Sequence, residues 1–162
     1  MRFLAKVKAK LIIYLIFVVI EILKMEKKIS NYISVAKVFT IATSINDTPY
    51  CANCFYVFDE ANKFLIFLSD EKTRHISEAL LNNRVAGTID AAITTVAKIQ
   101  GLQFTGKFIN PTEEQQQVFY KTYYNKFPFA KAKSSPIWGI QLNWVKMTDN
   151  TLGFGKKLKW ER

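Results

Sequence analysis

The residues best suited to do chemistry lie in one short polar segment, Ser69 and Lys72–His75. Arg74 can hold a phosphate through two parallel hydrogen bonds, and Thr73 can add a hydroxyl. A helix is expected to begin here, because apolar residues from Ile76 onward recur at helical spacing. The first turn of a helix offers free N–H groups and the positive end of the helix dipole. A strand end, a helix start, a hydroxyl and an arginine together predict a phosphate-binding site.

The same spacing also fits an N-capped surface helix with solvated charges, since short motifs match by chance. His75 is the only histidine in the chain, so no second histidine can act as its acid/base partner. We expect it to be structural or to face a phosphate. The sequence contains no hydrolase nucleophile elbow, no Walker loop and no metal-ligand cluster, and it identifies no catalytic residue.

Cys51 and Cys54 form a C-x-x-C pair, which invites a zinc or redox interpretation. A zinc site usually needs four ligands, and the chain has no further cysteine. On a strand, three residue steps place the two thiols on opposite faces with Cα atoms roughly 10 Å apart, whereas a disulfide needs less than about 7 Å. We therefore expect buried, reduced cysteines and no metal, with redox chemistry as the alternative.

Two strands are expected immediately before the polar segment, at Cys51–Phe58 and Lys63–Ser69, with a turn at residues 59–62. The second strand is apolar on both faces: Phe64, Ile66 and Leu68 point one way, and Leu65 and Phe67 point the other. Neither face can be left in water. This strand is therefore expected in a barrel wall, covered on the outside by a helix or a second subunit.

The remaining elements follow from periodicity and turn residues. The expected elements are a helix at Glu26–Lys37, a strand at Val38–Thr43, a turn at Asn46–Pro49, strands at Arg84–Asp90 and Thr94–Ile109, a helix from Thr112 to Phe127, and a strand at Pro136–Thr148. Changes in alternation predict bulges near Gly101 and Asn143. Thr112 and Gln115 fit a capping box.

Several stretches in this order resemble a known family. The pattern FDE…FLIFLS…TRH…LLNNRVAGTI, followed by IQGLQFTGK, is similar to the pyridoxamine 5'-phosphate oxidase-like FMN-binding split-barrel family. The likeness is in particular to a bacterial branch with a DNTLGFGKK-type tail, here Asp149–Lys157. It covers about residues 25–162. It implies a mainly β protein with a few helices, a six-stranded antiparallel split β-barrel that forms a homodimer.

The resemblance also implies a cofactor site. In the family, FMN lies at the dimer interface, and a hydroxyl and basic residues after the second hairpin strand hold its phosphate. This role falls to Thr73 and Arg74, assisted by Lys72 or His75. The implied cofactor-binding residues are Asn53, Cys54, Leu68, Ser69, Lys72, Thr73, Arg74, His75 and Gln100.

Within that set, backbone groups around Asn53 and Cys54 are expected to meet the ring or ribityl edge of the flavin, and Gln100 the ring. The alternative for Gln100 is an exposed amide beside a barrel-corner glycine. Members that oxidise pyridoxamine phosphate carry basic residues on the first hairpin strand, where this chain has Cys51 and Tyr56. The resemblance therefore does not imply that substrate.

Composition fits one domain with an anionic ligand. The chain has 162 residues, of which 49% are hydrophobic, and a net charge of +10. Five basic residues against one acidic residue give residues 1–24 a charge of +4, which leaves +6 for residues 25–162. That excess suits a phosphate group. Without a dense basic run, it does not point to nucleic acid.

Residues 1–24 differ from the rest of the chain. Leu11–Ile20 is an unbroken run of ten apolar residues, and a spanning helix needs at least roughly 17. Three interpretations stay open: a membrane anchor through residues 11–23, an uncleaved signal-like segment, or an extension upstream of a start at Met25. The family resemblance begins at Met25, which favours the third and a cytoplasmic domain at residues 25–162.

Two functions from different classes follow. The first is an FMN-binding, oxidoreductase-like homodimer acting on a small molecule that the sequence does not identify. The second is a non-catalytic module that binds haem, flavin or another anionic metabolite on the same scaffold.

Overall fold

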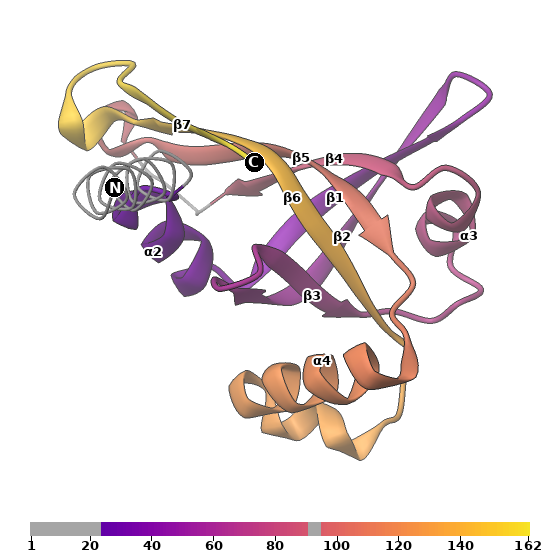
Figure 1. The fold of residues 1–162 in the computed structure, drawn as a ribbon. Coiled ribbons are helices and arrows are strands. Elements are labelled where there is room, and N and C mark those ends of the chain that lie inside the picture. The colour runs from indigo at the N-terminus through magenta and orange to yellow at the C-terminus, as the bar shows by residue number, and fades with distance from the viewer. Residues whose placement is uncertain (1–23, 91–94) are drawn as a thin grey trace, which may run out of the picture.

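The computed structural model describes residues 24–90 and 95–162, in which one strongly curved sheet carries three α-helices (Figure 1). The strands are β1 (Val38–Ile45), β2 (Thr48–Asp59), β3 (Phe64–Leu68), β4 (Arg84–Asp90), β5 (Gln100–Ile109), β6 (Ile137–Asp149) and β7 (Lys157–Glu161). The helices are α2 (Lys27–Val35), α3 (Arg74–Leu81) and α4 (Glu113–Lys126), with 3₁₀ turns η1 (Val96–Lys98), η2 (Pro128–Ala132) and η3 (Asn150–Leu152).

All strand pairs are antiparallel, in the order β3-β2-β1-β4-β5-β6-β7, and β3 also pairs with β6. This second pairing closes six strands into a ring, and β7 lies outside it against β6. The described sheet thus has seven strands where six were expected. The additional strand was missed because its charged residues alternate with only Leu158 and Trp160, a pattern typical of a short edge strand.

Strand β6 changes partners along one of its edges. Ile137–Gln141 pairs with β3, and Trp144–Thr148 pairs with β7. Between these two stretches the register with β5 skips Asn143, which is the extra residue of a β-bulge. The bulge expected near Asn143 is confirmed. A bulge bends its strand and increases the local twist, which lets β6 leave β3 at this point.

The prediction of a bulge near Gly101 is wrong. The strand expected over residues 94–109 begins only at Gln100, and its pairing with β6 is regular up to Thr105. The residues before it form η1, and this 3₁₀ turn causes the change in alternation that the sequence shows. Gly106 on the same strand is a glycine that the sheet does require, because an added Cβ would lie 2.6 Å from the backbone oxygen of Gln141.

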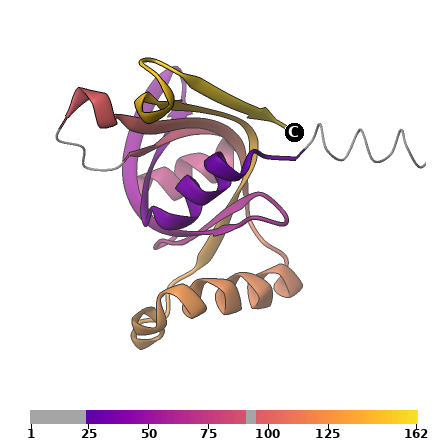
Figure 2. The same cartoon turned by 90° about the vertical axis from the view of Figure 1, so that its left-hand side faces the viewer.

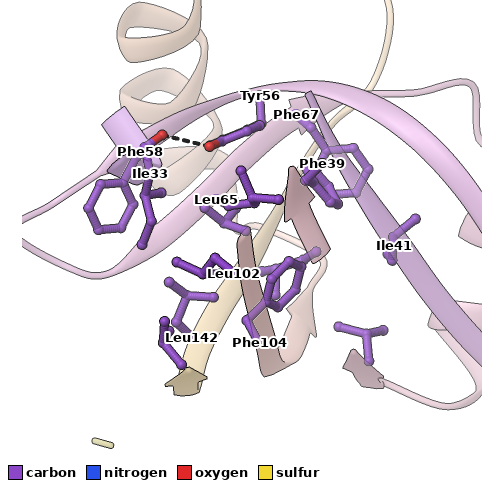
Figure 3. Packing of buried hydrophobic residues seen from close by; sticks show 14 of the residues in the cluster. Ile33, Phe39, Ile41, Tyr56, Phe58, Leu65, Phe67, Leu102, Phe104 and Leu142 are labelled. Carbon is purple, nitrogen blue, oxygen red and sulfur yellow. Dashed lines mark hydrogen bonds between the residues drawn. The ribbon is translucent and has the colours of Figure 1, made fainter. Parts of the chain in front are cut away.

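The inside of the ring is a continuous apolar core (Figure 3). Helix α2 lies across one end of the ring (Figure 2), and Ile29 and Ile33 on this helix are fully buried. The hydroxyl of Tyr56, also fully buried, donates to the backbone oxygen of Ile33 at 2.6 Å. Burial raises the pKa of Tyr56, so the phenol stays protonated and the bond persists.

Strand β3 is buried on both faces, as expected. Leu65 and Phe67 point into the ring, whereas Phe64 and Ile66 point outward against α4. The helix covers this outer face with an aromatic stripe: Phe119, Tyr123 and Phe127. The predicted capping box at the start of α4 is present. A helix of the same chain therefore fulfils the requirement that β3 be covered.

The β1–β2 hairpin extends further than expected. Its strands meet at a two-residue turn, Asn46-Asp47, where both residues have positive φ. This is the geometry that matches the twist of a tight hairpin, and Asn and Asp tolerate it better than most residues. Cys51 is exposed and Cys54 is buried, which confirms that they lie on opposite faces, although Cys51 is not the buried residue we expected.

None of the helices formed by residues 24–90 and 95–162 is long and apolar enough to span a bilayer. The apolar run expected as an anchor, at residues 11–23, lies outside the described residues.

Gly106 offers a direct test of the closed sheet. Replacing Gly106 with Ala forces its new methyl group against a backbone oxygen and the side chain of Ile140, both within 2.7 Å. We expect the free energy of unfolding to fall by about 1–3 kcal/mol, measured by urea denaturation. In Gly101→Ala the nearest atom is 3.7 Å away, an ordinary contact, so its loss should be smaller. Equal losses in the two variants would contradict this packing.

Candidate functional site

The N-terminal turn of α3 is where most of the predicted phosphate-binding residues meet. Thr73 precedes the helix with an extended backbone, but its side chain makes no capping hydrogen bond. Its hydroxyl donates instead to the backbone oxygen of Asp70, at 2.7 Å. The first N–H groups of a helix have no intrahelical acceptor. In α3 these belong to Arg74 and His75, so the helix start can accept an anion at the positive end of its dipole.

His75 anchors a cluster of hydroxyl groups beneath this turn. Its side chain is 7% exposed, and its Nε2 atom lies 2.9 Å from Ser69 Oγ and 3.4 Å from Thr73 Oγ1. The two hydroxyl oxygens are 3.2 Å apart. Burial lowers the pKa of His75 despite the opposing effect of the Glu78 carboxylate. The imidazole is therefore neutral at neutral pH in the free protein.

Cys54 lies behind this cluster. Its sulfur is 3.8 Å from His75 Nε2, and burial raises the pKa of the thiol to about 11. A thiol with that pKa stays protonated and is a poor nucleophile. Cys54 therefore acts as packing behind the imidazole.

Arg74 is held in place by two side chains, Glu78 and Tyr50. Its Nε atom donates to Glu78 Oε1 at 2.7 Å, and its guanidinium carbon lies 4.4 Å from the centre of the Tyr50 ring. The other carboxylate oxygen of Glu78 accepts from Thr43 Oγ1, at 2.5 Å. These hydrogen bonds, from Thr43 first and then Arg74, lower the pKa of Glu78. The Arg74 side chain is still 52% exposed, and its terminal Nη groups make no hydrogen bond to any described residue.

Ser69 is positioned by strand β6 rather than by its own neighbours. Its N–H donates to the backbone oxygen of Pro136 at 3.2 Å, and its backbone oxygen accepts from Trp138 Nε1 at 3.0 Å. These two bonds fix the end of β3 where the chain turns toward α3. The hydroxyl of Ser69 is thereby held beside Thr73.

Other predicted site residues lie near this turn without joining the cluster. Leu68 packs toward α4 in the outer apolar cluster. Lys72 is exposed in the loop before α3, where its N–H donates to Asp70 Oδ1. Asn53 is exposed on the outer face of β2, and its Oδ1 atom accepts from Thr40 Oγ1 at 2.7 Å.

Gln100 is not brought to this site within the chain. Ser69, at the α3 turn, bonds to Pro136 just before β6, whereas Gln100 pairs with Asp149, the last residue of that strand. The site and Gln100 therefore lie at opposite ends of β6. The amide of Gln100 donates instead to Asp149 Oδ2 at 3.1 Å.

Asp149 is the centre of a separate polar network. It is fully buried, and it accepts from Lys28 Nζ at 3.1 Å and from the N–H and hydroxyl of Thr151. Burial alone would raise the pKa of this carboxyl, but the hydrogen bonds outweigh it and lower the pKa to about 2. A cavity of about 440 Å³ adjoins this network, lined by Lys28, Asn31, Tyr32, Val35, Gln100 and Met147.

Sequence reasoning missed three residues at the α3 turn: Thr43, Tyr50 and Glu78. The i,i+4 spacing of Arg74 and Glu78 was a readable signal for an ion pair on a helix face. Thr43 and Tyr50 are directly opposite each other in the β1–β2 hairpin. Their contact with α3 depends on that register and on the packing of the helix, which no local pattern encodes.

Solved structures share this architecture. A haem-binding protein from Mycobacterium smegmatis superimposes with a TM-score of 0.68 at 12% identity, over 85% of this chain and 59% of its own. A FAD-binding protein from Mesorhizobium loti superimposes with a TM-score of 0.63 at 13% identity, over 76% of this chain and 94% of its own. A Listeria innocua protein provisionally named a pyridoxamine 5'-phosphate oxidase superimposes with a TM-score of 0.59 at 15% identity, over 74% of this chain and 94% of its own. The fold is that of the split-barrel proteins related to pyridoxamine phosphate oxidase.

The sequence relatives place the chain more narrowly. A UPF0306 protein from Photorhabdus laumondii is 42% identical over 134 residues, which is 83% of this chain and 94% of its own length. One from Serratia proteamaculans is 38% identical over 137 residues, 85% and 95% of the two chains. The protein therefore belongs to the UPF0306 family. No protein-family model matches the chain.

The buried carboxylate gives a pH-dependent prediction. Its pKa is about 2 in the folded protein against 3.8 for an ordinary Asp, so Asp149 contributes stability above about pH 4 that is lost as the pH falls toward 2. At pH 7 we expect Asp149→Asn to lower the free energy of unfolding by about 1–3 kcal/mol. The gap to wild type should shrink at pH 3. Exposed Asp90 provides the control Asp90→Asn, and a gap that is the same at both pH values would contradict the assignment.

Proposed function

We propose that this protein binds FMN at the start of α3 and acts as a flavin-dependent oxidoreductase on a small molecule. The observation that carries the proposal is the state of Arg74. Tyr50 and Glu78 hold its guanidinium in one orientation, yet the side chain is half exposed and its Nη groups are available. Holding a charged group in place before the ligand arrives reduces the entropy cost of binding.

The groups around Arg74 suit a phosphate monoester. The first N–H groups of α3 and the hydroxyls of Thr73 and Ser69 converge on the same turn, and none of the helix N–H groups is capped by Thr73. Helix N–H groups, hydroxyls and an arginine are the usual partners of a bound phosphate. The exposed Lys72 beside this turn adds positive charge. The chain's own residues therefore fit the phosphate of FMN.

The flavin ring, when bound, would supply the redox chemistry, and this chain would orient it and exclude water. Asn53 is exposed on the outer face of β2, on the strand that also carries Cys54 behind His75. A ring extending from the phosphate along that strand would meet its backbone. Gln100 pairs with Asp149 at the last residue of β6, whereas Ser69 at this turn bonds to Pro136, just before the first residue of that strand. We infer that Gln100 contacts the ring only if it comes from a second subunit.

We also propose that the protein is a homodimer, through the outer face of β1 and β2. From Val38 to Ile45 and from Thr48 to Phe58 neither strand has a charged residue. On the outer face, cross-strand pairs bring Val38 beside Phe55, Thr40 beside Asn53 and Ala42 beside Cys51. Phe55 remains 55% exposed. An uncharged sheet face with exposed apolar side chains is suited to contact a second copy.

The alternative is a non-catalytic module that binds haem, which the similarity to the M. smegmatis haem-binding protein supports. The chain's only histidine is buried, and its Nε2 atom is hydrogen-bonded to Ser69. Haem ligation through Nε2 of His75 would require that bond to break. Flavin binding requires no such rearrangement, so we favour FMN.

The first test is flavin binding by titration calorimetry and by the visible spectrum of the purified protein. We expect FMN to bind, and Arg74→Ala to weaken binding about tenfold to a hundredfold, since it removes a bidentate charge-assisted contact. Riboflavin, which lacks the phosphate, should bind wild type and Arg74→Ala with similar weak affinity. Lys121→Ala removes an exposed positive charge on α4 and serves as the charge-matched control.

The outcomes separate the alternatives. A Soret band in the purified protein would favour the haem-binding module. Equal FMN affinity in wild type and Arg74→Ala, or no FMN binding at micromolar protein, would refute the phosphate site.

The second test is the oligomeric state, measured by size exclusion with light scattering. We expect wild type to be a dimer and Ala42→Arg to be a monomer, because the arginine would bury an unpaired charge at the proposed interface. Lys107→Ala, on the exposed side of β5, should stay dimeric. A monomeric wild-type protein would refute the homodimer, and a dimeric Ala42→Arg variant would place the interface elsewhere.

A further inference from the structure

Whether the Ser69 hydroxyl at the α3 turn can donate a hydrogen bond to a ligand depends on the protonation of His75. Thr73 has one hydroxyl proton, and it goes to the backbone oxygen of Asp70. Ser69 also has one, and its oxygen lies 2.9 Å from His75 Nε2. When Nε2 is unprotonated it accepts that proton, and neither hydroxyl can then donate to a ligand. When Nε2 carries a proton it donates to Ser69 Oγ, and the Ser69 proton is released to point outward.

An imidazolium allows only the second arrangement, because both of its ring nitrogens are donors. We propose that His75 acts as a positioning residue that sets the hydrogen-bond direction of Ser69, and that it takes up a proton when a phosphate monoester dianion binds at this turn. The inference rests on the proposed function and concerns the regulation of the same site. Ligand binding would thereby be coupled to proton uptake.

The coupling requires that no group near His75 already stabilises the protonated ring. The Glu78 carboxylate on α3 acts on the ring electrostatically, and Cys54 on β2 contacts it. The other charged or titratable groups near this turn are Arg74 on α3, Tyr50 on β2, and Asp70, Glu71 and Lys72 in the preceding loop. Strand β1, which packs against α3, has no titratable residue.

None of these groups already stabilises an imidazolium strongly. The Glu78 carboxylate is shared between Arg74 and Thr43, and Cys54 remains a neutral thiol. A bound dianion would be the first strong counter-charge for the ring. Because the ring is 7% exposed, water would screen that charge only in part.

The sign of the pH dependence follows by linkage. Burial lowers the pKa of His75 in the free protein, and a neighbouring dianion would raise it. Between the two pKa values the ring is neutral without ligand and charged with it. Affinity for the dianion then falls by up to about tenfold per pH unit as the pH rises through that window. The ligand's own second ionisation, near pH 6, acts in the opposite direction and has to be separated from it.

The single histidine makes the experiment direct, because one imidazole signal reports the titration by NMR. The ring of the full-length protein is titrated alone, with saturating FMN and with saturating riboflavin. We expect FMN to raise the pKa of His75 by at least about one unit and riboflavin to leave it unchanged, since only FMN carries the phosphate. An equal shift with both ligands would show that burial by the flavin ring is responsible, and would overturn the inference.

A matched variant separates the protein's proton from the ligand's. In His75→Gln the side-chain amide can still donate near the Nε2 position, but it does not titrate. The FMN affinity of this variant should follow the ligand's ionisation alone, so its ratio to wild type should change with pH. FMN binding with an unchanged His75 titration would overturn this inference and leave the proposed function standing. Failure of FMN to bind the wild-type protein would overturn the proposed function itself.

Discussion

The pairing of β3 with the first half of β6 is the interaction on which the site depends. It closes the ring, and it brings the Pro136 carbonyl and the Trp138 indole to the two sides of Ser69. The end of β3 is thereby fixed at the point where the chain turns toward α3. Because β3 is apolar on both faces, the pairing is stabilised by the barrel interior and by α4 together. Loss of either layer would release Ser69 and the start of α3 with it.

A second constraint holds α3 against the barrel. Thr43 and Tyr50 are cross-strand neighbours, and they contact the two members of one i,i+4 pair on the helix, Glu78 and Arg74. The hairpin therefore sets both the position of the helix and the orientation of its arginine. An arginine on an isolated surface helix would lose several rotatable bonds on binding a ligand. Here the fold has already restricted that freedom, which is the condition for tight recognition by a single cation.

The sequence predicted those features that depend on local alternation. The two apolar faces of β3 required a cover, which is α4, and the change in phase near Asn143 marked a real bulge. The similar change near Gly101 came from a 3₁₀ turn, since alternation alone cannot distinguish a bulge from the end of a strand. Gln100 was assigned to the flavin by resemblance, and the β5–β6 register places it at the end of β6 away from Ser69. Strand register is set by long-range pairing. Contacts that depend on the register therefore cannot be predicted from local sequence patterns.

The two ends of the barrel differ in how far their polar groups are satisfied. At the α2 end, the fully buried Asp149 has Lys28, Gln100 and Thr151 as partners, so its lone pairs are used within the protein. This network stabilises the fold, and it leaves the Asp149 carboxylate no free lone pair for a ligand. At the α3 end, the Nη groups of Arg74 and the first helix N–H groups have no partner among the described residues, beside a region that water can reach. A binding site must keep donors unsatisfied where solvent can serve them until the ligand arrives. The α3 end meets that condition, and the charge of its free donors selects an anion.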